Sequence, residues 1–235
     1  MANASDVDAL RKGPRHWNHY VMDEQLADPS WRAQLLGVDI SLAQLPHADL
    51  REAQLADAKL VESNLSRAHL RRAHLGSATL ERAVLIGTDL SGANLCRANL
   101  LGATLSDADL QGAELLGSNL ERADLQCADL QGVNLKNALL RQADLDDAIL
   151  SGANLSEADL RDSSLQRASM VGAILTGADL RGVNLQQADL QLANLQFADL
   201  RGADLQGANL REAQMVGANV EGAKLLGVSG TPKTT

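Results

Sequence analysis

Aspartate is the most frequent residue of this chain that could act in catalysis or in metal binding. Asp89, Asp109 and Asp129 recur at intervals of twenty residues. A second group of aspartates lies among and just after them, at Asp107, Asp124, Asp144, Asp146 and Asp147. Two carboxylates held together can act as a general acid and a general base, and several can hold a hard cation such as Ca²⁺. Either chemistry requires elements that bring the carboxylates to one point in a concave site.

The elements of this chain are set by an apolar residue at every fifth position from Leu35 to Leu225. The residue two positions before it is small, and it is Ala in most units. On an α-helix, five residues advance by about 140° net, so the apolar positions would define no face. On a strand, an odd step would move them from one face to the other. The chain must therefore turn once per unit, as in a solenoid, although its Ala and Leu content favours helix.

The repeated unit has the pattern A-(D/N)-L-x-x, as in Ala93–Asn94–Leu95 and Ala108–Asp109–Leu110. This pattern closely resembles the pentapeptide-repeat family, and it covers most of the chain. The resemblance implies an all-β solenoid, a right-handed quadrilateral β-helix with four pentapeptides per coil and one on each side. It also implies that the Leu and the small residue point inward, and that the other three residues of each unit point outward.

Two series of residues support a period of four units. Gly recurs every twenty residues at Gly92, Gly112, Gly132, Gly152 and Gly172, and Arg does so at Arg141, Arg161, Arg181 and Arg201. The glycines are expected where one corner of the coil needs a permissive backbone. Nearly ten coils stacked at about 4.8 Å would give a rod about 47 Å long.

A convex rod without inserted loops offers no pocket in which the aspartates converge. We therefore expect them to lie on solvated faces, and we expect no enzymatic activity, no cofactor and no metal. The flat faces of a rod cannot wrap a Ca²⁺ ion. His16 and His19 are too few and too loosely spaced to indicate a metal site.

Composition and charge narrow the partners further. The net charge of −9 argues against direct binding to nucleic acid. No segment is long and apolar enough to span a membrane, and the N-terminal residues lack the apolar core of a secretory signal, so a cytoplasmic location is expected. Cys96 and Cys127 fall on opposite sides of a four-sided coil, too far apart for a disulfide.

The ends of the chain depart from the repeat, which predicts a helical cap at residues 1–30, the β-helix at 31–227 and a tail at 228–235, all within one structural domain. Ser5 is expected to cap a first helix that ends near Gly13–Pro14. A second helix is expected over His16–Leu26. The segment from Gly13 to Asn18 resembles the G-x-x-x-W-N lead-in of many bacterial pentapeptide arrays.

A cap is needed at the N-terminal end because the first coil would otherwise expose Leu and an unpaired backbone edge. At the C-terminal end, Leu226 and Val228 are expected either to fold over the last coil or to leave it for another copy of the chain, which would make the protein a monomer or an end-to-end dimer.

The function expected from these features is a non-enzymatic scaffold that presents ladders of side chains to an unidentified protein partner. Apolar residues at outward positions toward the C-terminal end mark the expected contact surface, because a contiguous exposed group is typical of an interface. Phe197, the sole Phe of the chain, is the leading candidate, and the other candidates are Val171, Ile174, Leu192 and Val216.

A second candidate surface is a mixed-charge ladder. It pairs Asp159, Asp179 and Asp199 with Arg161, Arg181 and Arg201, which follow them by two positions. Exposed pairs of this kind contribute little, and self-compensation of charge is the simpler interpretation of most of the ladder.

The alternative function is that of a DNA mimic. Pentapeptide-repeat proteins of the quinolone-resistance type protect DNA gyrase with acidic rods, and the resemblance extends to rod size and acidity. Three features of the chain weigh against it: the tail lacks their C-terminal dimerisation helix, no loop breaks the array, and charges of both signs are spread over the four sides.

Overall fold

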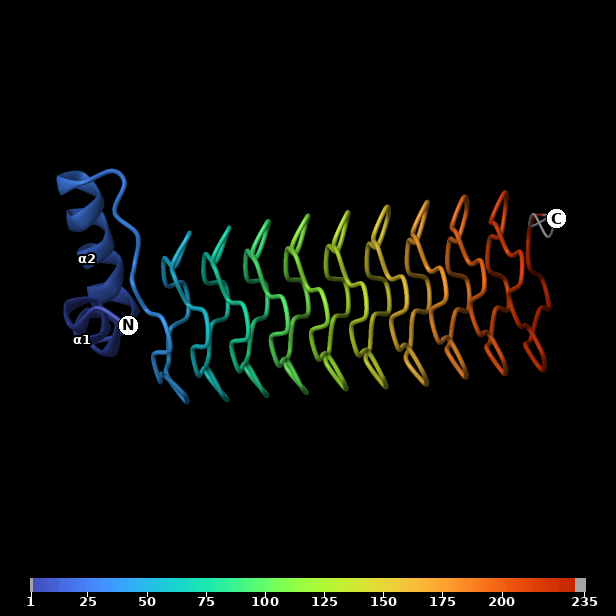
Figure 1. Ribbon diagram of the computed structural model, residues 1–235, viewed down its shortest axis with the longest axis horizontal. Coiled ribbons are helices and arrows are strands. Elements are labelled where there is room, and N and C mark those ends of the chain that lie inside the picture. Colours follow the sequence, from blue (N-terminus) through green and yellow to red (C-terminus); the bar gives the residue numbers. More distant parts are fainter. Residues whose placement is uncertain (1, 231–235) are drawn as a thin grey trace.

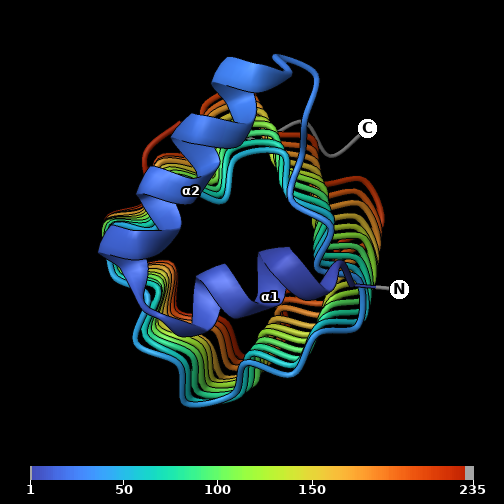
Figure 2. The same cartoon turned by 90° about the vertical axis from the view of Figure 1, so that its left-hand side faces the viewer.

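The computed structural model describes residues 2–230 and shows a straight rod with two helices at its N-terminal end (Figure 1). The rod is a right-handed quadrilateral β-helix, as predicted. Each side of a coil contributes one residue to a parallel bridge with the residue twenty positions on, for example Asn94 with Glu114. Viewed along the rod, the coils superpose on one four-sided outline (Figure 2).

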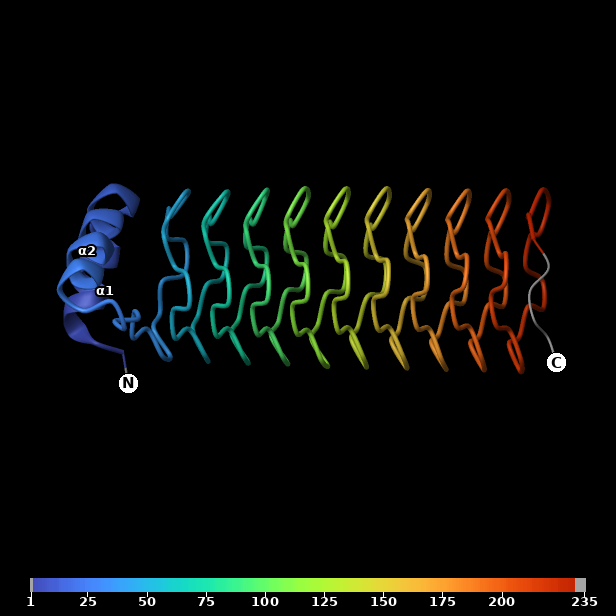
Figure 3. The same ribbon diagram turned by 90° about the horizontal axis from the view of Figure 1, so that it is seen from above.

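Each side is named here after the first residue of its ladder of bridges. The four ladders begin at Gln34, Asp39, Gln44 and Asp49, and they continue to Gln214, Asn219, Lys224 and Ser229. From above, the coils stay evenly stacked along the whole rod (Figure 3). The array therefore extends to Ser229, slightly beyond the boundary expected at residue 227.

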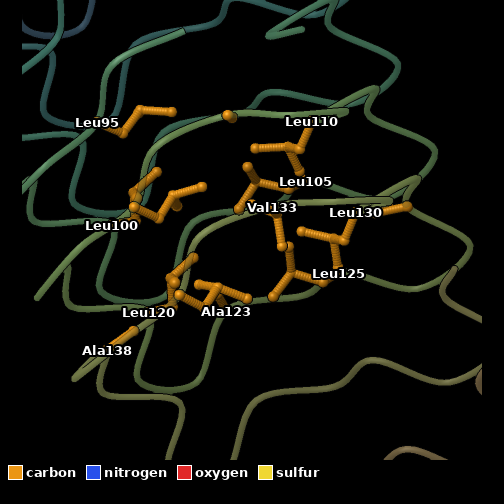
Figure 4. Close-up of a cluster of buried hydrophobic side chains, with 14 of the residues drawn as sticks. Leu95, Leu100, Leu105, Leu110, Leu120, Ala123, Leu125, Leu130, Val133 and Ala138 are labelled. Carbon is orange, nitrogen blue, oxygen red and sulfur yellow. The ribbon is translucent and has the colours of Figure 1, made fainter. Parts of the chain in front are cut away.

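The interior consists of the apolar residue and the small residue of each unit, as predicted. The Leu residues at every fifth position from Leu45 to Leu210 are at most 2 % exposed, and Ala123 is 1 % exposed. Their side chains point into the centre of the coil (Figure 4). Where Ser or Thr replaces the small Ala, its hydroxyl donates to a backbone carbonyl, as Ser118 Oγ does to the Leu115 oxygen at 2.8 Å. A buried hydroxyl is thereby satisfied.

Every corner of the rod has the same backbone conformation. The residue two after the core residue has a positive φ in every unit from Gly37 to Gly227, and more than half of these residues are not glycine. A turn hydrogen bond closes each corner, such as Ala98 N–H to the Leu95 oxygen at 3.0 Å. Positive φ at this position is the signature of a type II turn. The corner of the Gly92 series adopts the expected permissive conformation, and the other three corners adopt it as well.

The Asp or Asn before each Leu has a local task. Its side-chain oxygen accepts the backbone N–H two residues later, as Asn94 Oδ1 does from Cys96 at 3.0 Å and Asp109 Oδ1 from Gln111 at 3.0 Å. This is an Asx turn, which these two short polar side chains favour. Much of the recurrence of Asp in the sequence is explained by this turn rather than by chemistry.

The cap consists of α1 (Ala4–Arg11) and α2 (Pro14–Ala27), which cross the open end of the first coil (Figure 2). The N-cap of α1 is Asn3, whose side chain accepts from Ser5 N–H, so the expected cap at Ser5 was two residues late. Helix α2 begins at Pro14, where the fixed φ of proline suits the first turn, and it extends slightly beyond the predicted range. Neither helix has the length or apolar composition that crossing a bilayer demands.

The cap supplies hydrogen bonds that a preceding coil would have supplied. The Trp17 indole donates to the Asp49 carbonyl at 2.7 Å, and Asp49 N–H donates to Asn18 Oδ1 at 2.8 Å. On the Gln34 side, Asn3 N–H donates to the Gln34 carbonyl, and Gln34 N–H donates to the buried carboxylate of Asp6, both at 2.7 Å. The backbone edge of the first coil is thus satisfied on two of its sides.

The C-terminal end is less covered. Leu226 is 78 % exposed and therefore does not fold over the last coil, contrary to the first of the two expectations. Val228 is partly buried against the core, at the position of the small residue. The remaining part of the expected tail, residues 231–235, lies outside the described residues.

Candidate interaction surfaces

The apolar residues expected to form a contact surface lie along one side of the rod. Ile174 belongs to the Gln34 ladder, Phe197 and Val216 lie at the corner that follows this side, and Val171 and Leu192 lie at the corner that precedes it. We call these five residues the Phe197 patch. Phe197, Leu192 and Ile174 are 66 %, 48 % and 41 % exposed. Val171 and Val216 are half-buried.

Phe197 is held against the next coil. Its N–H donates to the Val216 carbonyl at 3.0 Å. Its ring lies over Gly217, where an added Cβ would come within 2.6 Å of the ring carbon Cδ1. The ring is therefore supported from below while most of its surface faces solvent. Polar neighbours in the same ladder, Asn154 and Asn194, border Ile174 on both sides.

The residues of the charge ladder lie on the Asp39 side and at its following corner, and they form ion pairs. Arg161 binds Asp159 through two hydrogen bonds, Nε to Oδ1 at 2.8 Å and Nη2 to Oδ2 at 2.5 Å. The same arrangement recurs for Arg181 with Asp179. Arg161 also approaches Asp179 of the next coil at 3.5 Å, which joins the coils.

The last pair of the ladder is Asp199 with Arg201, 2.6 Å apart. The hydrogen bond from Arg201 holds the pKa of Asp199 below its ordinary value. Arg141 does not join the ladder, because Leu139 occupies the position of the Asp in that coil. Within residues 2–230, Nε of Arg141 is buried and has no hydrogen-bond partner. The carboxylates and guanidinium groups of the ladder pair with one another, so few of their hydrogen-bond donors and acceptors are left for a ligand.

The recurring aspartates meet at one edge of the rod, where the Gln44 side joins the Asp49 side. Asp89 lies one coil before the others on the Asp49 side, and we call the remaining seven the acidic edge: Asp107, Asp109, Asp124, Asp129, Asp144, Asp146 and Asp147. Within the described residues, only Asp147 is paired with a cation, Arg167 at 2.6 Å. Others accept from neutral side chains, as Asp129 does from Gln111 at 2.6 Å. No group of His, Cys, Asp and Glu among residues 2–230 is arranged to hold a metal ion.

Cys127 is exposed at the same edge, between Asp107 and Asp147 of the neighbouring coils, and Cys96 is half-buried at the opposite corner. Both thiols are free, as predicted.

Two surfaces were missed by the sequence interpretation. One is a coil of exposed basic residues, which we call the basic band: Arg67, His69, Arg71, Arg72 and His74. Its signal in the sequence is a run of five basic residues without an acid, which is confined to one coil and does not recur at intervals of twenty residues. The other is the exposed apolar pair Met22 and Leu26 on α2, 52 % and 75 % exposed.

Comparisons with known proteins agree with the geometry. The family described as Pentapeptide repeats matches the chain in eight copies, which together extend from residue 48 to residue 227. A search of curated proteins finds no match.

Two solved structures illustrate the similarity. One is HetL, a pentapeptide repeat protein involved in heterocyst differentiation regulation from the cyanobacterium Nostoc sp. strain PCC 7120. The two chains are 33 % identical, the match covers 89 % of this chain and 92 % of that one, and the TM-score is 0.64. The other is trypsin-treated QnrB1, a plasmid-mediated fluoroquinolone resistance protein. It is 19 % identical, with coverage of 82 % and 91 % and a TM-score of 0.56, which shows a shared fold alone.

Proposed function

This chain belongs to the pentapeptide-repeat family, and we propose that it is a non-enzymatic scaffold that binds a protein partner through the Phe197 patch. The observation that carries the proposal is Phe197 itself, an aromatic side chain 66 % exposed at an outward position of an otherwise polar repeat. Aromatic anchors with polar surroundings are typical of the energetic centre of protein interfaces.

The rigidity of the support strengthens the proposal. The Phe197 ring rests on Gly217, and the backbone of Phe197 is paired with Val216. The side chain is therefore already held in place before a partner binds. A pre-ordered anchor loses less conformational entropy when a partner binds. HetL, the relative at 33 % identity, is described as involved in regulation, which fits a protein that acts through contacts.

The test compares two matched variants of the tagged full chain in capture experiments with lysate from cells that make the protein. Phe197→Ser removes the anchor. Leu42→Ser is the control, because Leu42 is 65 % exposed at a corner with the same positive φ but lies near the other end of the rod. We expect a protein retained by the wild type and by Leu42→Ser to be lost from Phe197→Ser. Equal retention by both variants would refute the patch as the contact surface.

A DNA mimic that protects DNA gyrase is the second candidate, and the acidic edge is the observation that favours it. Its seven aspartates lie within neighbouring coils and have one cationic partner among the described residues. Duplex DNA presents about one charge per 1.7 Å, so the charge density of this edge is of a similar order. A gyrase supercoiling assay, with and without a quinolone, tests this candidate. Inhibition or drug protection by the wild type that Asp109→Asn with Asp129→Asn abolishes would support it, and no effect of the wild type would remove it.

A further inference from the structure

The basic band concentrates positive charge on a chain that is acidic as a whole. Its five side chains are all exposed and come from one coil, where they extend from the corner before the Asp49 side, across that side and the next corner, to His74 on the Gln34 side. Three of them are arginines, and no acidic residue interrupts the run from Arg67 to His74. This part of one coil is therefore basic, although the net charge of the chain is −9.

The arginines of the band keep their donors free. Among residues 2–230, none of the five side chains of the band has an ion pair or a hydrogen bond in the structure. By contrast, Arg51, one coil earlier on the same corner, donates twice to Asp49, at 2.8 and 2.5 Å. A guanidinium group offers five N–H donors in a planar fork that matches a carboxylate. The band thus has donors that the protein itself does not use.

Glycine in the next coil keeps these arginines accessible. A Cβ added to Gly87 would lie 3.6 Å from Cγ of Arg67, and one added to Gly92 would lie 3.5 Å from Cγ of Arg72. The stems of the two arginines therefore extend over glycine positions, which carry no side chain. Beside Arg72 lies a hollow of about 330 Å³, lined by Arg71, Arg72, Ser91, Gly92, Asp109 and Gln111.

An apolar surface adjoins the band on the side of the cap. Helix α2 crosses the first coil at Asp49, and Met22 and Leu26 are exposed on it. These two side chains line a hollow of about 430 Å³ together with Val21 and Arg51, among others. Arg51 precedes Arg71 by one coil at the same corner, so the hollow and the band form a continuous surface.

We propose that this surface binds a short acidic segment of a protein partner. Carboxylates of the segment pair with Arg71 and Arg72, and an apolar side chain of the segment packs into the hollow beside Met22 and Leu26. The site is separate from the Phe197 patch, near the opposite end of the rod, and it gives the scaffold a second contact of defined chemistry.

The neighbouring coils favour a short segment over a nucleic acid. Along the rod, the band is followed on the same side by Asp89, Asp109 and Asp129. Since one coil rises by about 4.8 Å, a nucleic acid lying along the rod would soon meet these carboxylates with its phosphates. A short segment that reaches from the hollow beside Arg51 to Arg71 and Arg72 ends before Asp109 and Asp129.

Fluorescence anisotropy with the full chain tests the proposal. The probe is a labelled peptide of about ten residues that contains glutamates and one central leucine. The variant Arg71→Glu with Arg72→Glu reverses the charge of the band. The control is Arg82→Glu with Arg97→Glu, which makes the same change in net charge at exposed corners outside the band. A third variant, Met22→Ser with Leu26→Ser, tests the apolar hollow.

We expect the band variant to weaken peptide binding by about tenfold or more, because two charge-assisted contacts are lost. The hollow variant should weaken it by severalfold, and the control by less than about twofold. No binding to the wild type, or equal weakening by the band variant and the control, would overturn the proposal. A single-stranded oligonucleotide of equal charge that displaces the peptide at lower concentration would also overturn it.

Phe197→Ser should leave the affinity for the peptide unchanged, because it lies many coils away. If the peptide fails to bind, the proposal for the basic band is refuted and the proposal for the Phe197 patch is unaffected. If Phe197→Ser loses the captured protein, the Phe197 patch is supported whether or not the basic band binds the peptide. The two proposals succeed or fail separately.

Discussion

Replacing Asn18 with Ala removes the side chain that stands in for a missing coil. In the body of the rod, the residue before each Leu donates its N–H to a carbonyl of the preceding coil, as Asn94 does to Ala73 at 2.9 Å. For Asp49 no such coil exists, and Oδ1 of Asn18 accepts the N–H at 2.8 Å instead. The Asn18 amide also donates to the His47 carbonyl at 2.9 Å.

The expected cost follows from these two bonds. The N–H of Asp49 is partly buried and would lose its partner, which costs about 1–3 kcal/mol, whereas the His47 carbonyl bond is exposed and contributes about 1 kcal/mol or less. We therefore expect Asn18→Ala to lower the free energy of unfolding by about 2 kcal/mol. Because each coil of a solenoid contacts its neighbours alone, the loss should be concentrated in the first coils.

Urea unfolding gives the total loss, and hydrogen exchange measured by mass spectrometry gives its location. His19→Ala is the matched control, since His19 is an exposed neighbour on α2. Faster exchange confined to the cap and the first coils is the expected result. If Asn18→Ala lost no more stability than His19→Ala, or if exchange accelerated evenly along the rod, the account of the cap would be refuted.

Three further predictions follow from the same structure. Gly217→Ala should cost about 1–2 kcal/mol for a residue with positive φ, and more while the Phe197 ring is present, so a double-mutant cycle with Phe197→Ala should show coupling rather than additivity. Asp199→Asn should destabilise the protein more at pH 7 than at pH 2. The folded-state pKa of Asp199 is lowered by Arg201, so its contribution is present above the unfolded pKa of about 3.9 and is lost as the pH falls through the folded value. Equal destabilisation at both pH values in urea titrations would contradict the prediction. Ala123→Phe should overpack the core and cost about 1–3 kcal/mol in thermal melts, whereas the same change at an exposed corner should cost far less.

The fold was readable from the sequence because one physical rule governs most of the chain. A core side chain at every fifth position leaves one geometry for the backbone, and the structure places Leu and Ala inside as that rule requires. The pairing of Asp159 with Arg161 was also readable, since two residues two positions apart on one side of a coil have no freedom to separate.

The features that escaped the sequence depend on contacts that no period encodes. The uniform positive φ at all corners was obscured because residues as different as Arg67 and Phe197 adopt it alongside glycine. The role of Asn18 depends on how α2 meets the first coil, which cannot be derived from either segment alone. The freedom of Arg71 and Arg72, in contrast to the pairing of Arg51, is decided by which carboxylates lie within reach in three dimensions.

The central claim is that a protein partner contacts the side of the rod that carries Phe197. The most direct measurement places a photoreactive amino acid at position 192, within the patch, or at position 42, an equally formed corner outside it, in cells that make the protein. Irradiation should yield a discrete heavier cross-linked species from position 192 and none from position 42. The same species from both positions, or none from position 192, would contradict the claim.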